Sequence, residues 1–269
     1  MPEPRNPFHW SLAVTSSEAF VGRESELGSI FGRLGNMGCS SIVGDRRIGK
    51  SSLLYQAYAQ APLRLGFEYR PIYVDMQRGA NHTLDGLLTG IAKNLGRKLE
   101  VTEETAPPKM LAAFERAVEE ARREGLFPVL LVDEFESLAG RIEVFGDNVL
   151  ESWRSLCAGQ MAVVTASQQP LSTIMRKGGY TSPFYNIFEQ VKLGEFTEAE
   201  AREFREWTRR AGTFDGQHVA FILKEGRQHP LRLMVCAYHL FEAKQRGEVD
   251  YEALRTQVQN SMGTMLGQQ

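Results

Sequence analysis

Apolar residues along the chain form two patterns, short continuous runs and stripes at helical spacing. The runs predict buried strands, and they fall at 39–43 (CSSIV), 70–76 (RPIYVDM), 127–135 (FPVLLVDEF), 161–167 (MAVVTAS) and near 189–196 (EQVKLGEF). Stripes of apolar residues three and four positions apart predict helices, most clearly at 27–34, 84–95 and 110–121. Strands that alternate with helices indicate an α/β fold with crossover connections and a mostly parallel sheet.

The strand pattern stops after Phe196. Thr197 and Glu200 form a capping-box pattern that begins a helix, and helical patterns also fit 216–224, 230–246 and 250–262. We therefore expect three parts along the chain. They are an irregular lead-in segment at 1–19, an α/β core at 20–195 and a small all-helical unit at 196–269.

Composition and charge narrow the class of protein. The 269 residues carry 31 Lys and Arg against 33 Asp and Glu, a net charge of −2, so no overall positive field favours nucleic acid. The three cysteines are far apart and lack metal-site spacing, which indicates free thiols in a reducing compartment. The first residues lack the apolar stretch of a signal peptide, and no apolar run is long enough to span a membrane. We expect a cytoplasmic protein without a membrane partner.

The turn after the first predicted strand carries the strongest chemical signal. Residues 44–51 read GDRRIGKS, which matches GxxxxGK[ST] between a strand and a helix, the context of a phosphate-binding loop. Backbone N–H groups of such a loop cradle phosphate oxygens, and the following helix presents its positive N-terminus. Lys50 is expected to reach the phosphates and Ser51 to hold Mg²⁺. The nucleotide-binding residues predicted here are Gly44, Arg46, Arg47, Ile48, Gly49, Lys50, Ser51 and Ser52.

A pair of acidic residues, Asp133 and Glu134, ends the most apolar strand. By itself such a pair is as often a solvated loop. Together with the loop at 44–51 it predicts that Asp133 holds Mg²⁺ with Ser51, and that Glu134 is the general base for an attacking water.

The strand at 161–167 ends in polar residues. Thr165, and with less support Ser167, is a candidate for sensing the terminal phosphate or orienting water. The alternative is that both hydroxyls satisfy nearby backbone groups, which is common for Ser and Thr.

Several of these segments together resemble a known family. FVGRESEL at 20–27, GDRRIGKSSLL, LLVDEFE, LGEFTEAEA and Gly226 with His229-Pro230 are similar to the STAND branch of P-loop ATPases and to their AAA+ relatives, the origin-recognition ATPases. The resemblance covers about residues 18–245. It implies a three-layer P-loop NTPase sandwich with a parallel sheet in the order 5-1-4-3-2, a C-terminal helical lid, and ATP or ADP with Mg²⁺.

The resemblance also implies site residues outside the two main motifs. Backbone around Val21 and Gly22, with Arg23 nearby, lies over adenine in such proteins, and a lid residue, here His229 or Pro230, touches the nucleotide. Pro230 is alternatively a good first residue of a helix, and His229 a capping imidazole. His229 stands where AAA+ proteins usually have a lid arginine.

Other arginines have simpler interpretations. Arg176 is a candidate arginine finger for a neighbouring subunit, although lone arginines are mostly solvated. The arginines at 202, 205, 209 and 210 are spaced with glutamates on one helix and predict an exposed, salt-bridged face.

The function predicted from these features is a Mg-dependent ATPase switch that hydrolyses ATP slowly to ADP and phosphate. Its catalytic residues are Glu134, Lys50 and Thr165, and its nucleotide state is coupled to partner binding or self-assembly. The alternative is a DNA-associated AAA+ ATPase, a loader or a regulator of transposition or replication, against which the net charge of −2 counts. A small-molecule kinase is disfavoured by the Asp133-Glu134 pair, and a GTPase by the lack of an NKxD-type motif.

Overall fold

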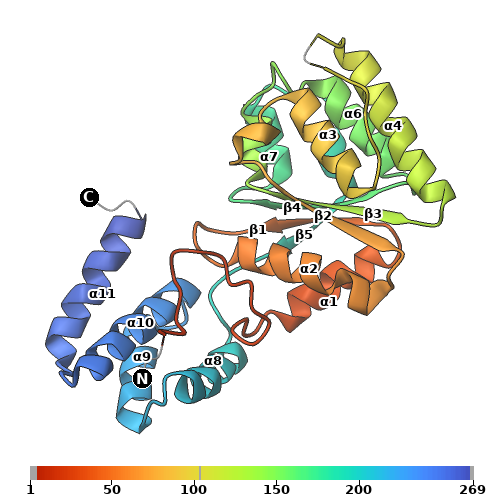
Figure 1. The fold of residues 1–269 in the computed structure, drawn as a ribbon. Helices are drawn as coiled ribbons and strands as arrows, with labels where there is room; N and C mark the ends of the chain where they lie inside the picture. Colours follow the sequence, from red (N-terminus) through yellow and green to blue (C-terminus); the bar gives the residue numbers. More distant parts are fainter. Residues whose placement is uncertain (1–4, 103, 267–269) are drawn as a thin grey trace. The chain divides into compact units, whose positions relative to one another are not determined.

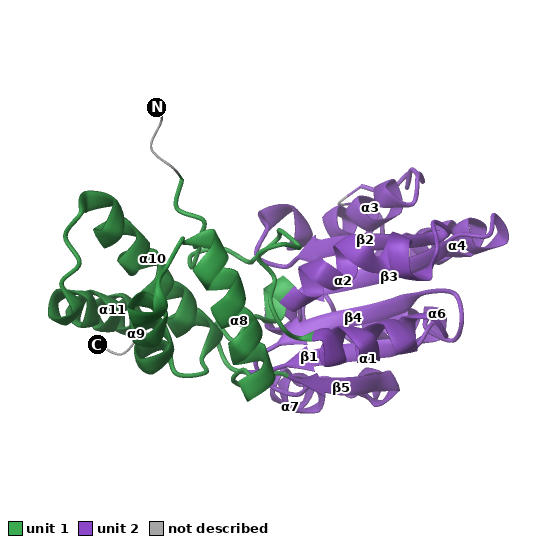
Figure 2. Ribbon diagram, turned by 90° about the horizontal axis from the view of Figure 1, so that it is seen from below, with its two compact units in different colours: residues 1–23, 45–52, 193–269 green, residues 24–44, 53–192 purple. Residues whose placement is uncertain are grey.

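A computed structural model describes residues 5–102 and 104–266 (Figure 1). The chain forms two compact units by its internal contacts. One unit comprises the residues up to 23, residues 45–52 and the residues from 193 onward, and the other comprises 24–44 and 53–192 (Figure 2). The division expected at residue 196 stays a prediction, and residues 1–4 of the expected lead-in lie outside the described residues.

A five-stranded parallel sheet forms the centre of the second unit. Its strand order is β2-β3-β4-β1-β5, which confirms the predicted order 5-1-4-3-2. Strands β1, β3 and β4 are almost entirely buried, as expected for central strands of a parallel sheet. The strands are β1 Cys39–Val43, β2 Tyr69–Asp75, β3 Phe127–Asp133, β4 Ala162–Ser167 and β5 Phe188–Lys192.

Helices cover both faces of the sheet and complete the expected three layers. Helices α1 Glu24–Leu34 and α2 Lys50–Leu65 lie on one face, and α3 Leu84–Asn94, α4 Pro107–Arg123, α6 Asp147–Leu156 and α7 Leu171–Lys177 lie on the other (Figure 1). The apolar stripe of α1 is buried as predicted. Three short helices, η1 Gly79–Asn81, α5 Phe135–Ala139 and η2 Phe184–Ile187, complete the unit.

Four helices follow the sheet in the chain, α8 Glu198–Ala211, α9 Gly216–Gly226, α10 Pro230–Arg246 and α11 Tyr251–Leu266. They confirm the predicted change from strands to helices. Helix α8 begins with the expected capping box, in which the Thr197 side chain accepts a hydrogen bond from the Glu200 N–H. No helix among the described residues is both long and apolar enough to cross a membrane.

The lead-in segment is irregular, as predicted, but it belongs to the core of the helical unit. Phe8 is fully buried, and its ring centroid lies 5.3 Å from that of Trp207 and 5.6 Å from that of Phe214. The Asn6 side chain donates hydrogen bonds to the Tyr238 carbonyl and to Glu242. Residues 5–14 therefore contribute to the packing of α8 and α10.

Candidate functional site

The loop at 44–51 has a backbone suited to an anion. Arg47 and Gly49 adopt positive φ values of 62° and 104°. Alternation of right- and left-handed residues turns successive N–H groups to one side and forms an anion-binding concavity. Ile48 is buried and anchors the loop, and its N–H donates to the Asp45 carbonyl at 3.4 Å.

Helix α2 begins directly after this loop, at Lys50. Its first turn contains no acidic residue, so nothing offsets the positive end of the helix dipole or repels a phosphate. The Lys50 ammonium donates to the Asp45 carbonyl at 2.8 Å, within the loop itself. The Ser52 hydroxyl accepts a hydrogen bond from the Val14 N–H at 2.9 Å, while Ser51 is half-buried.

The carboxylate of Asp133 is fixed at the end of β3. It is buried, its Oδ2 accepts the Tyr73 hydroxyl at 2.7 Å, and its Oδ1 accepts the Glu134 N–H at 3.0 Å. Burial and the neighbouring Asp133 raise the pKa of Tyr73 far above its usual value, so this phenol stays a donor. Tyr73 thus contacts a predicted site residue, and the sequence analysis did not identify it.

Glu134 follows Asp133 in a left-handed conformation, with φ of 54°. A residue with a Cβ is strained there by about 1–3 kcal/mol, and such strain is concentrated at functional sites. The side chain is half-buried and makes no cap bond to α5. Its conformation is compatible with the role predicted for a general base.

The two polar residues of β4 have different positions. Ser167 ends the strand, and its hydroxyl donates to the Gln169 carbonyl at 2.8 Å, the local bond that the simpler interpretation expects. Thr165 lies two residues inside the strand and is fully buried, and no described residue hydrogen-bonds its hydroxyl. Its catalytic role stays a prediction.

Strand register brings the ends of β1, β3 and β4 to one edge of the sheet. Val132 of β3 is paired with Thr165 of β4, and Val43 of β1 with Ser167 of β4. The N–H of Gly44, the first loop residue, donates to the Ser167 carbonyl at 3.3 Å. The phosphate loop and the acidic pair therefore follow strands that end on the same edge.

The donor set predicted for Mg²⁺ consists of the Ser51 hydroxyl and the Asp133 carboxylate. Both are hard oxygen ligands, and Mg²⁺ is usually held by one or two carboxylates together with substrate phosphates. The described residues contain no cluster of three or more His, Cys, Asp or Glu side chains that could hold a metal ion without a substrate. By their chemistry these two oxygen donors suit a metal that arrives with a nucleotide, and Mg²⁺ binding stays a prediction.

His229 and Pro230 begin α10 in the same unit as the loop residues 45–52. Pro230 occupies the first helical turn, as its simpler interpretation expects, and His229 is the N-cap residue but makes no side-chain cap bond. The His229 Nδ1 atom is buried, and no described residue hydrogen-bonds it. Burial lowers the pKa of His229, whereas the charges of Glu195 and Asp45 oppose this change.

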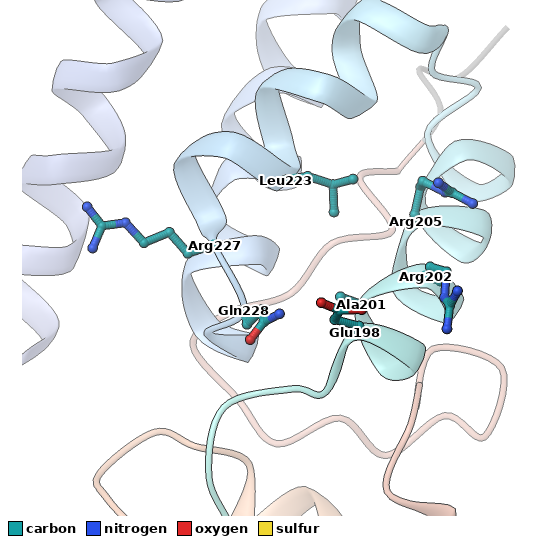
Figure 3. A pocket seen from close by; sticks show the side chains of 7 residues that line it. All are labelled: Glu198, Ala201, Arg202, Arg205, Leu223, Arg227 and Gln228. Carbon is teal, nitrogen blue, oxygen red and sulfur yellow. The ribbon is translucent and has the colours of Figure 1, made fainter.

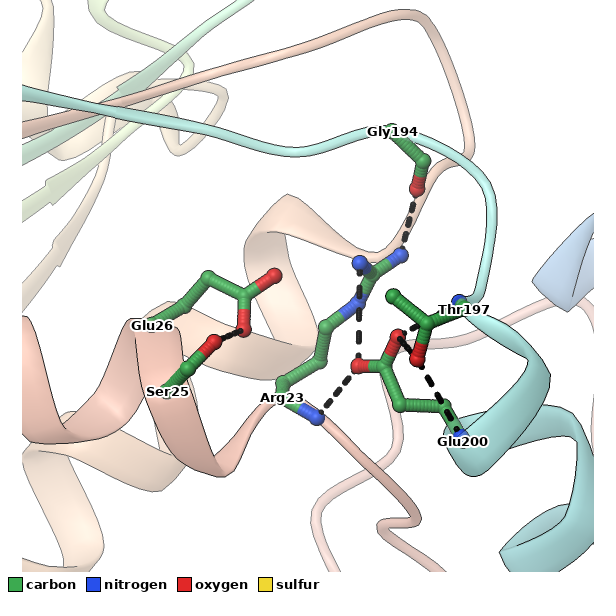
Figure 4. A network of polar contacts seen from close by, with 6 residues as sticks. All are labelled: Arg23, Ser25, Glu26, Gly194, Thr197 and Glu200. Atoms are coloured by element: carbon green, nitrogen blue, oxygen red, sulfur yellow. Dashed lines mark hydrogen bonds and ion pairs between the residues drawn. The ribbon is translucent and has the colours of Figure 1, made fainter.

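The segment at 21–23 is joined to the beginning of α8. Gly22 and Arg23 have φ values of 73° and 66°, and a Cβ on Gly22 would lie 2.8 Å from Glu200 Cγ. The Arg23 side chain is buried, and its Nη2 donates to the Gly194 carbonyl at 2.6 Å (Figure 4). The guanidinium carbon lies 4.8 Å from the centroid of the Phe196 ring.

Glu200 is the acceptor at the centre of this network. Its carboxylate accepts the Arg23 N–H at 2.7 Å and the Thr197 N–H at 2.8 Å, and it lies 3.9 Å from Arg23 Nη1 (Figure 4). Burial alone would raise the pKa of Glu200, but these hydrogen bonds and the Arg23 charge hold it below its usual value. The Arg23 guanidinium thus has a structural role, and a nucleotide contact of this segment stays a prediction.

Arg176, the candidate arginine finger, is exposed on α7. Its guanidinium carbon lies 6.0 Å from the centroid of the Tyr185 ring, at the outer limit of a cation–π contact. Its role in a neighbouring subunit stays a prediction.

Comparison with known proteins gives a family and a fold. Residues 33–175 match the AAA domain family. The Walker-type ATPase PABY2304 of Pyrococcus abyssi has a TM-score of 0.67 at 17% identity, over 96% of this chain and 77% of that chain. The Aeropyrum pernix ORC2 protein, solved as ADPNP–ADP complexes, has a TM-score of 0.63 at 17% identity, over 96% of this chain and 71% of that chain.

A third similar structure is the Drosophila ORC bound to DNA, with a TM-score of 0.63 at 19% identity, over 94% of this chain and 64% of that chain. No curated protein sequence matches the chain. At identities this low, the three likenesses show the fold alone.

Proposed function

We propose that this chain, which belongs to the AAA domain family, is a Mg-dependent ATPase switch of the STAND type. It would bind ATP, hydrolyse it slowly, and couple the nucleotide state to partner binding or self-assembly. The observation that carries this proposal is the loop at 44–51, whose left-handed residues Arg47 and Gly49 precede a helix with no acid in its first turn.

Each residue of the site has a distinct task in this proposal. The loop N–H groups hold the phosphates, and Lys50 exchanges its Asp45 carbonyl partner for a phosphate oxygen. Ser51 and Asp133 supply oxygen ligands to Mg²⁺, which when bound neutralises charge on the transferring phosphoryl group. Tyr73 holds the Asp133 carboxylate in place through its 2.7 Å hydrogen bond. Glu134 accepts a proton from the attacking water.

The helical unit is proposed to act as the lid. His229 has a buried ring nitrogen without a hydrogen-bond partner among the described residues. This nitrogen supports a phosphate or ribose contact at the beginning of α10. Val21 and Gly22 are proposed to cover adenine with backbone groups.

The direct test is the affinity of Lys50→Ala for a fluorescent ATP analogue. The substitution removes a charged hydrogen-bond donor, which costs about 2–3 kcal/mol of binding free energy. The affinity should therefore fall about 100-fold. Lys109→Ala, a charge-matched change at an exposed position of α4, should bind like the wild type. If Lys50→Ala binds as tightly as the wild type, the site is assigned incorrectly.

A second candidate function is a DNA-associated AAA+ ATPase. It is supported by the likeness to the Drosophila ORC bound to DNA and opposed by the net charge of −2. ATP-dependent retention on duplex DNA that weakens with rising salt would favour it. Equal retention with and without ATP would count against it.

A further inference from the structure

A hollow of about 380 Å³ lies within the helical unit, and none of the residues proposed to bind nucleotide lines it (Figure 3). Helix α8 forms one side, and the end of α9 with the turn that follows it forms the other. Its volume is within the range of natural ligand pockets. The lining residues are Glu198, Ala201, Arg202, Arg205, Leu223, Arg227 and Gln228.

The charge of this lining is strongly biased, with three guanidinium groups and a single carboxylate. Part of the expected salt-bridged face of α8 is present, because Arg205 pairs with Glu206 at 3.1 Å. Among the residues that the structure describes, no hydrogen bond or ion pair engages the guanidinium of Arg202 or Arg227. Both side chains are exposed and available to a ligand.

The positive groups lie to either side of a centre that contains the Glu198 carboxylate. In Figure 3 the side chain of Arg227 extends on one side of the hollow, and those of Arg202 and Arg205 extend on the opposite side. Leu223, Gln228 and Glu198 lie between them. A complementary ligand would therefore carry anionic groups at two ends and an apolar group in the middle.

The backbone at Arg227 supports a role for its side chain. This residue has φ of 53° and ψ of −130°, a conformation that favours glycine. The glycine beside it is required where it stands, because a Cβ on Gly226 would lie 2.6 Å from Leu233 Cδ2. Arginine thus occupies a position where glycine would relieve strain, and its side chain extends outward from the hollow that this residue lines (Figure 3).

We propose that this hollow docks a short acidic peptide segment of a partner protein. An apolar side chain of the segment packs on Leu223 and Ala201, and carboxylates on either side pair with Arg227 and with Arg202. Guanidinium groups match carboxylates with two parallel hydrogen bonds. Glu198 in the lining disfavours a carboxylate at the centre and thereby sets the order of acidic and apolar residues.

Nucleic acid fits this lining less well. Single strands are held by aromatic side chains that stack on bases, and no lining residue is aromatic. Trp207, on the same helix, packs against Phe8 and Phe204 instead. A phosphate backbone would also leave Leu223 without an apolar partner.

The test uses the full chain and a fluorescein-labelled synthetic peptide with one leucine flanked on both sides by Asp and Glu. Its binding is followed by fluorescence polarisation at low salt. We expect the double variant R202E/R227E to bind about tenfold or more weakly than the wild type, and replacement of the leucine by serine to weaken binding as well. The control K109E/R116E changes the net charge equally, at exposed positions of α4, and should bind like the wild type.

Three results would overturn the proposal. They are no peptide binding by the wild type at low salt, equal binding by R202E/R227E, and binding of labelled oligo(dT) that is tighter than peptide binding and is lost in R202E/R227E. Because the hollow is separate from the phosphate loop, R202E/R227E should keep the wild-type affinity for the ATP analogue. That measurement also shows that the variant is folded, and it keeps a failure here distinct from a failure of the proposed ATPase function.

Discussion

Replacement of Glu200 by alanine should destabilise the helical unit by about 3–4 kcal/mol. The Glu200 carboxylate accepts hydrogen bonds from the Arg23 N–H, the Thr197 N–H and the Thr197 hydroxyl at 2.7–2.9 Å. Loss of the capping box alone costs about 1 kcal/mol. The backbone N–H of Arg23 would lose its acceptor, and the Arg23 side chain, 5% exposed, would lose one nearby carboxylate, which together add about 2–3 kcal/mol.

The effect should depend on pH in a defined direction. Since the folded-state pKa of Glu200 is below its ordinary value of 4.5, its stabilising effect is fully present above that pH. The effect is lost as the pH falls below 4.5 through the folded-state pKa. The difference between wild type and Glu200→Ala should therefore be constant near neutral pH and shrink in acid.

Hydrogen exchange of the amides of α8, measured by mass spectrometry, reports this unit separately from the sheet. We expect protection of α8 to fall about 100-fold or more in Glu200→Ala. Glu203→Ala, an exposed position on the same helix, is the matched control and should change stability by no more than about 0.5 kcal/mol. Protection in Glu200→Ala that equals that of the control would refute the role assigned to the network.

Two further predictions concern the proposed catalytic residues. Tyr73→Phe removes the hydrogen bond to Asp133, so we expect steady-state ATP hydrolysis to slow by about tenfold. Urea unfolding should show a loss of about 1 kcal/mol in the free energy of unfolding. An unchanged rate of hydrolysis would show that Asp133 does not need the hydrogen bond from Tyr73. Glu134→Gln should retain ATP binding and hydrolyse it about 100-fold more slowly. Light scattering of this variant should give a larger mass in Mg-ATP than in Mg-ADP, and equal masses would exclude ATP-driven self-assembly.

The sheet and the phosphate loop could be predicted because their signals are local in sequence. A continuous apolar run such as 127–132 is buried on both faces of a parallel sheet, and the alternation of strands and helices leaves few possible topologies. The pattern at 44–51 also restricts the backbone directly, since it contains a glycine where φ is 104°. The strand order itself came from the family resemblance and is confirmed.

Contacts between distant residues could not be predicted in this way. The network of Arg23 and Glu200 joins residues 177 positions apart, and nothing in the sequence links the arginine predicted near adenine to the glutamate of the capping box. Phe8 stands in a proline-rich segment without periodicity, so nothing local indicates that it is buried. Tyr73 was recognisable as part of a strand, but its bond to Asp133 depends on the pairing of β2 with β3. These features follow from tertiary packing, which a single sequence does not specify.

Positive backbone φ values are shared by charged residues in four different segments of the structure. Six described residues other than glycine have positive φ, and four of them are charged: Arg23, Arg47, Glu134 and Arg227. Glycine would adopt each of these conformations with less strain. Arg47 lies in the phosphate loop, and Glu134 follows strand β3. Arg23 contacts the beginning of α8, and Arg227 lines the hollow. Because a side chain at such a position costs about 1–3 kcal/mol, the surrounding structure must hold each of these residues in its strained conformation.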